Sequence, residues 1–172
     1  MYFSIKTLIQ AITVVSLTLG LTQMSFSMDQ VITHGALQII SPRSVETPPN
    51  ASVGAGYMII KNTGETDDIL LSGSVEFAQS VEIHEMKVEN DVMKMRPMLS
   101  GIVIPAGGMI ELKPGGFHLM FMKLDAPFKV GDVNSVTLSF KNAGDIELDF
   151  SVLSRKDILS GNHGAKHGHK HH

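Results

Sequence analysis

The sequence contains no cysteine and no tryptophan, and only 6% of its residues are aromatic. Without thiols the chain has no disulfides and no thiol redox chemistry, and it lacks the thiolate that blue-copper electron-transfer sites require. A redox-active metal would therefore have to bind to histidine, methionine or carboxylate side chains. The lack of a cysteine near the N-terminus also gives no support to lipoprotein anchoring.

Basic residues do not dominate the charge. The chain has 14 Lys and Arg against 17 Asp and Glu, a formal net charge of −3. This balance argues against a nucleic acid or an anionic membrane surface as the partner.

Long apolar runs are scarce, and the clearest one lies at the N-terminus. Residues 8–21 are mostly apolar and follow Lys6, while Ser25 and Ser27 supply small residues before Met28. We interpret residues 1–27 as a secretory signal peptide. The alternative is a transmembrane anchor, but the run is short against the roughly 20 residues that span a bilayer. We expect no membrane span after cleavage.

Residues 28–155 are predicted to form one all-β domain, a sandwich or barrel. Short β-rich runs recur at about ten-residue spacing, and turn residues such as Gly, Pro, Asn and Asp separate them. The predicted strands are 31–40, 56–62, 69–74, 80–87, 92–98, 109–112, 118–123, 135–141 and 146–153. Two antiparallel hairpins are expected, one with a four-residue link at 88–91 and one with a link at 142–145.

The C-terminal residues 156–172 form a histidine-rich tail that should be disordered without a ligand. Its histidines are His163, His167, His169, His171 and His172. An expression tag is one explanation. Because Gly, Ala and Lys interrupt the histidines, we favour a native metal-binding tail.

Histidine and methionine also gather within the domain. His118 and Met120 are two residues apart on a predicted strand, so they share one face. His84 lies on the first strand of the 80–98 hairpin and Met95 on its second strand, and we expect these two residues to lie roughly opposite each other. Auxiliary thioethers are available nearby, from Met86, Met93 and Met122.

These residue types are suited to Cu(I). Thioether sulfur is soft and uncharged, so it binds Cu(I) in preference to zinc, magnesium or calcium. The structural alternative is a β-sandwich with a methionine-rich core and an incidental pair of histidines. The residues by themselves leave both interpretations open. His34 is isolated and is read as a structural or surface residue.

Motifs for catalysis are lacking. There is no G-x-S-x-G and no phosphate-binding loop. His84-Glu85 begins like H-E-x-x-H, but the fifth position of that motif is Val88 and not His. We therefore expect a carrier and not an enzyme.

Several segments resemble the PCu(A)C family of periplasmic copper chaperones. The most specific is 104–120, IPAGGMIELKPGGFHLM, and it is joined by 56–64, 81–86 and 93–97. The resemblance covers about residues 30–153. The family's ligand pattern is a His, ten residues, a Met, about 21 residues, and then His-x-Met. Here ten residues separate His84 from Met95 and 22 separate Met95 from His118, so Met93 stays as the alternative to Met95.

The resemblance implies a cupredoxin-like Greek-key β-sandwich that binds Cu(I) through His84, Met95, His118 and Met120. It also implies delivery of Cu(I) toward cytochrome c oxidase. We expect the protein to be a monomer, exported to the periplasm by the signal peptide. Its partner would be a copper-accepting oxidase subunit or another copper chaperone. The rival function is copper buffering or resistance without a dedicated acceptor. The imidazoles of the tail suit Cu(II), with zinc and nickel as alternatives.

Overall fold

The computed structural model describes residues 30–160, and the predicted signal peptide and the tail histidines lie outside them. Within this part of the chain no helix is long and apolar enough to cross a membrane. The elements are β1 (Val31–His34), β2 (Leu37–Val45), β3 (Val53–Asn62), β4 (Asp68–Ser74), β5 (Ala78–Glu89), β6 (Val92–Pro97), β7 (Ile102–Ile104), β8 (Met109–Leu112), β9 (Phe117–Leu124), β10 (Val133–Phe140), β11 (Gly144–Leu153) and α1 (Arg155–Ser160).

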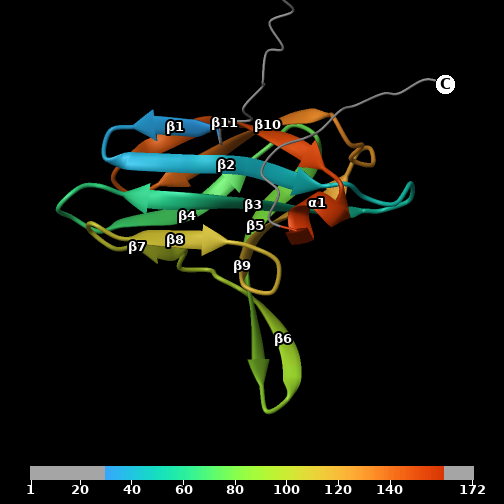
Figure 1. Ribbon diagram of the computed structural model, residues 1–172, viewed down its shortest axis with the longest axis horizontal. Helices are drawn as coiled ribbons and strands as arrows, with labels where there is room; N and C mark the ends of the chain where they lie inside the picture. The colour runs from blue at the N-terminus through green and yellow to red at the C-terminus, as the bar shows by residue number, and fades with distance from the viewer. Residues whose placement is uncertain (1–29, 161–172) are drawn as a thin grey trace, which may run out of the picture.

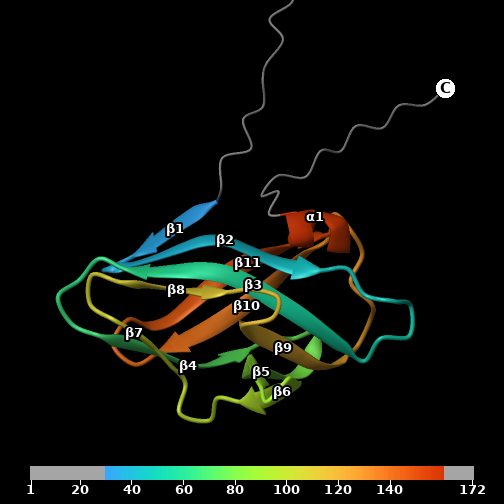
Figure 2. The same cartoon turned by 60° about the horizontal axis from the view of Figure 1, so that its bottom comes forward.

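The strands form a closed β-sandwich, which confirms the predicted fold class (Figure 1). The hydrogen-bonded order is β6-β5-β9-β8-β3-β2-β11-β10-β4-β7, with β1 beside β2. Additional pairings join β9 to β3 and β5 to β4. Because β5 pairs with both β9 and β4, the path of strands closes on itself, as the second view also shows (Figure 2).

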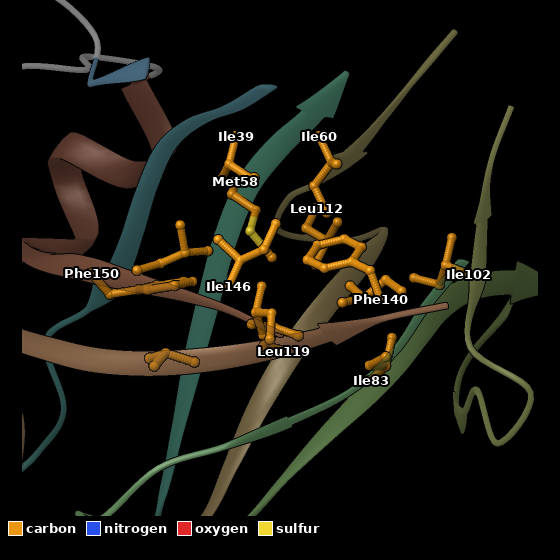
Figure 3. Close-up of a cluster of buried hydrophobic side chains, with 14 of the residues drawn as sticks. Ile39, Met58, Ile60, Ile83, Ile102, Leu112, Leu119, Phe140, Ile146 and Phe150 are labelled. Atoms are coloured by element: carbon orange, nitrogen blue, oxygen red, sulfur yellow. The ribbon is translucent and has the colours of Figure 1, made fainter. Parts of the chain in front are cut away.

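Alternating apolar residues explain why these segments are strands. In β11, Ile146, Leu148 and Phe150 are buried and the residues between them are exposed. Successive strand side chains point to opposite faces, so this pattern buries one face and solvates the other. The inward side chains of both layers meet in one hydrophobic core (Figure 3).

The β5–β6 hairpin differs from its prediction. Its link is two residues, Asn90 and Asp91, with φ of 53° and 62°. Positive φ at both positions is typical of a type I′ turn, and Asn and Asp tolerate it. Both strands therefore extend to the turn, and the register places His84 opposite Pro97. The prediction that His84 lies opposite Met95 is wrong; Met95 lies opposite Met86.

Three smaller features differ from the sequence prediction. The run 31–40 is divided by a turn at Gly35 into β1 and β2, and the three-residue strand β7 was not expected. The short helix α1 occupies the first residues assigned to the tail. Ser154 caps it, since its hydroxyl accepts a hydrogen bond from the Asp157 amide at 3.2 Å. Ile158 then packs against Tyr57, so this helix is part of the domain.

Candidate metal site

The adjacent strands β5 and β9 present one face to the core and the other outward. Ile83 and Leu119 are buried and point into the core (Figure 3). Because side chains alternate along a strand, His84 on β5 and His118 on β9 lie on the opposite, outer face. Met120 shares that face with His118.

The two predicted histidine ligands are direct partners. His84 and His118 are paired in the β5–β9 register, and their ring centroids lie 5.9 Å apart at an interplanar angle of 47°. His118 is only 5% exposed. The two imidazoles are thus close enough to bind a single ion with small side-chain adjustments.

The two predicted methionine ligands flank this histidine pair. Met120 lies opposite Glu82, and Met95 lies opposite Met86. Each methionine is therefore one diagonal step from His84, a separation of about 7–8 Å that long side chains can bridge. The four residues share one face of three neighbouring strands.

The auxiliary methionines lie at different distances from this centre. Met86 is two residues from His84 on the same face of β5. Met93 lies opposite Val88, one step nearer the hairpin turn, and Met122 lies opposite Ser80, one step further along β9. The register therefore favours Met95 over Met93 as a neighbour of His84.

The carbonyl oxygen of Gly116 orients His118. Its distance to His118 Nδ1 is 3.0 Å. A carbonyl oxygen only accepts, so Nδ1 carries the proton and neutral His118 has its lone pair on Nε2. Metal-binding histidines are commonly oriented in this way by a backbone carbonyl.

Glu82 orients His84 and is a residue that the sequence analysis missed. Its Oε2 lies 2.8 Å from His84 Nε2. The carboxylate accepts from Nε2–H, so the lone pair of neutral His84 is on Nδ1. The signal was present in the sequence, because Glu82 is two residues before His84 and shares its face of the strand.

His84 Nδ1 is the most informative atom of the site. It is buried, and no residue of the described part of the chain gives it a hydrogen bond. An unsatisfied buried polar atom costs about 1–3 kcal/mol, which a bound ligand would offset. Within residues 30–160 no group of three or more His, Cys, Asp or Glu is arranged to hold a metal ion. A metal at this face would therefore depend on thioethers as well as imidazoles.

Comparison with known proteins identifies relatives over most of the chain. A family model described as "LpqE-like: Putative lipoprotein LpqE-like" matches residues 37–152. The chain is 30% identical over 175 residues to "Putative lipoprotein Lxx21020" of Leifsonia xyli subsp. xyli (strain CTCB07), covering 92% of this chain and 96% of the relative.

Solved structures with the same fold include PCuAC domains. The apo PCuAC domain from PmoF1 has a TM-score of 0.62 and 23% identity, over 73% of this chain and 99% of that domain. The copper-bound PCuAC domain from PmoF2 has a TM-score of 0.62 and 21% identity, over 73% of this chain and 98% of that domain. The solution structure of CuI-DR1885 from Deinococcus radiodurans has a TM-score of 0.51 and 26% identity, over 72% of this chain and 80% of that protein. The expected family resemblance and fold are confirmed by these matches.

Proposed function

This chain belongs to the LpqE-like family, and we propose that it is an exported copper carrier that binds Cu(I) through His84, Met95, His118 and Met120. The observation that carries the proposal is the pairing of His84 with His118, flanked on the same face by two thioethers. The unpartnered Nδ1 of His84 adds support. The copper-bound PmoF2 domain and CuI-DR1885 share the fold.

The ligand set favours Cu(I) as cargo. Two imidazoles and two thioethers carry no charge, and thioether sulfur prefers the soft monovalent ion. The lone pairs on His84 Nδ1 and His118 Nε2 need no deprotonation in the neutral side chains. The site therefore accepts Cu(I) without a cysteine thiolate, which suits an oxidising compartment outside the cytoplasm.

Release to an acceptor is proposed to begin at Met95, the exposed ligand of the set. Met95 is 46% exposed, so an incoming ligand can replace its sulfur while the imidazoles still hold the ion. An acceptor with thiolate ligands binds Cu(I) more strongly and would complete the transfer. We propose that the acceptor lies in the periplasm. It is either a copper-binding subunit of cytochrome c oxidase during assembly or a second copper chaperone.

The histidine-rich tail is proposed as a second, less selective metal site, for Cu(II) above zinc or nickel. Its residues lie outside the described part of the chain. Their attachment point is informative, because Leu159 of α1 and Met120 line the same cavity of about 270 Å³. The described chain therefore ends on a cavity that one proposed Cu(I) ligand also lines, and we propose that the tail raises the local copper concentration at that site.

Cu(I) titration tests the proposed ligands. The mature chain with its five tail histidines replaced by Ala should bind Cu(I) stoichiometrically, with X-ray absorption showing two S and one or two N neighbours. Met95→Leu with Met120→Leu should abolish this binding. Met109→Leu, at a methionine 66% exposed on β8, is the matched control and should change nothing. Unchanged affinity in the Met95/Met120 variant would remove the proposal.

A second experiment separates delivery from buffering. Deletion of the gene should lower oxidase activity at limiting copper if the protein delivers copper. Copper sensitivity with normal oxidase activity would instead support the rival buffering function.

A further inference from the structure

The β5–β6 hairpin extends beyond the body of the domain as a two-stranded ribbon (Figure 1). The β5–β9 register ends where Glu85 pairs with Phe117, and the Met86 amide then donates to the Gly116 carbonyl at 3.0 Å. From there to the turn at Asn90, β5 pairs with β6 alone.

One face of the ribbon is charged and internally paired. Glu89 forms ion pairs with Lys94, at 3.2 Å, and with Arg96. Glu85 and Lys87 lie on the same face by alternation. This is an ordinary solvated strand face.

The other face carries thioethers. Met86 lies opposite Met95, and Val88 lies opposite Met93. Met93 is 64% and Met95 46% exposed, and neither packs against the buried clusters of residues 30–160. Methionine usually fills gaps in a core, so core packing does not explain these side chains.

We propose that Met86, Met93 and Met95 form an outer, all-sulfur Cu(I) site. Directly opposite strand residues have Cβ atoms about 4.5–5.5 Å apart, and diagonal ones about 7–8 Å. With three rotatable bonds in each side chain, the three sulfur atoms can converge on one ion. Three neutral thioethers select Cu(I) over harder ions. The inference rests on the proposed function only for the identity of the ion.

Met95 belongs to both sites, which gives the ribbon a role in loading. It lies opposite Met86 and one diagonal step from His84. Cu(I) moves inward as its bonds to the sulfurs of Met86 and Met93 break and bonds to His84 Nδ1, His118 Nε2 and the Met120 sulfur form. The Met95 sulfur stays bound throughout. The ion remains Cu(I), and no proton moves because both nitrogen lone pairs are free in the neutral imidazoles.

The test removes the inner site and asks whether a sulfur site remains. His84→Ala with His118→Ala is introduced into the mature chain that has its tail histidines replaced by Ala, and Cu(I) is titrated anaerobically against a chromophoric chelator. We expect stoichiometric Cu(I) with sulfur neighbours only. Adding Met86→Leu and Met93→Leu should abolish this binding, whereas adding Met109→Leu, at an exposed methionine of β8, should leave it intact.

Failure of this inference is distinguishable from failure of the proposed function. If the parent with intact His84 and His118 binds Cu(I) but the histidine variant binds none, only the outer site is overturned. Binding that survives Met86→Leu and Met93→Leu in the histidine variant overturns it as well, because the ion is then held by other residues. Thermal melts verify folding, and His84→Gln with His118→Gln replaces the alanine pair if the latter unfolds.

Discussion

His84 and His118 face each other across β5 and β9, with their ring centroids 5.9 Å apart. Each imidazole is oriented by a different acceptor, the Glu82 carboxylate for His84 and the Gly116 carbonyl for His118. The same Gly116 oxygen accepts from the Met86 amide at the base of the ribbon. The site and the ribbon are therefore joined by one backbone group.

Glu82 should strengthen Cu(I) binding although it is not a proposed ligand. Glu82→Ala removes the acceptor that fixes the His84 tautomer, and we expect affinity to fall about 10–100-fold, as for other residues that orient metal ligands. Glu82→Gln should restore most of it, because the amide oxygen still accepts from Nε2–H. Chelator competition measures both variants. Glu85→Ala, on the other face of β5, is the control, and an equal loss there would contradict the prediction.

Asp68 should be a major contributor to stability. Its buried carboxylate accepts hydrogen bonds from the amides of Ile69, Asn142 and Ala143 at 2.7–3.0 Å. Asp68→Ala leaves these donors without their acceptor, and we expect a loss of about 3 kcal/mol in the free energy of unfolding. Denaturant unfolding measures it. Asp67→Ala, which removes a bond to the exposed Ala106 amide, should cost clearly less.

Gly101 should tolerate no side chain. Its φ is +76°, and an added Cβ would lie 2.3 Å from the carbonyl oxygen of Leu70. Gly101→Ala should therefore lower the unfolding free energy by more than the ~1–2 kcal/mol of the left-handed conformation alone. Gly107 has a φ of +64° and open space around it, so Gly107→Ala measures the cost of the left-handed conformation without a steric clash. Equal melting temperatures for Gly101→Ala and Gly107→Ala would contradict the prediction.

Tyr57 should weaken the fold at alkaline pH. Burial raises its pKa above the ordinary 10.0, and the positive charges of Arg155 and Arg43 oppose that rise. The folded state thus favours the neutral phenol. This stabilisation is fully present below pH 10.0 and is lost as the pH rises through the folded-state pKa. The difference in unfolding free energy between the wild type and Tyr57→Phe should shrink or reverse above that pH, and a constant difference would argue against it.

Most of the strands could be predicted from local features of the sequence. Alternation and turn residues located most strands, including those that carry His84 and His118. The short β7 was missed because three residues give too little period to recognise. The hairpin register was misjudged because the turn consists of Asn90 and Asp91 alone and is two residues shorter than the predicted link 88–91.

The candidate site was also predictable only in part. That His118 and Met120 share a face follows from the period of a strand, and the same holds for Glu82, His84 and Met86. Pattern could not supply the pairing of β5 with β9, which sets His84 opposite His118. Those strands are far apart in sequence, and their pairing is chosen by burial of Ile83 and Leu119 in the shared core.

The sequence by itself determined the soft, uncharged donor set, since a chain without cysteine has only methionine for sulfur ligands. It also determined which donors share each strand face. Tertiary structure alone decided which faces meet, which imidazole nitrogen is left with a free lone pair, and that three thioethers stand on an exposed ribbon. The physical reason is that side-chain direction is a local property of the backbone, whereas strand pairing and hydrogen-bond partners depend on how the whole core packs.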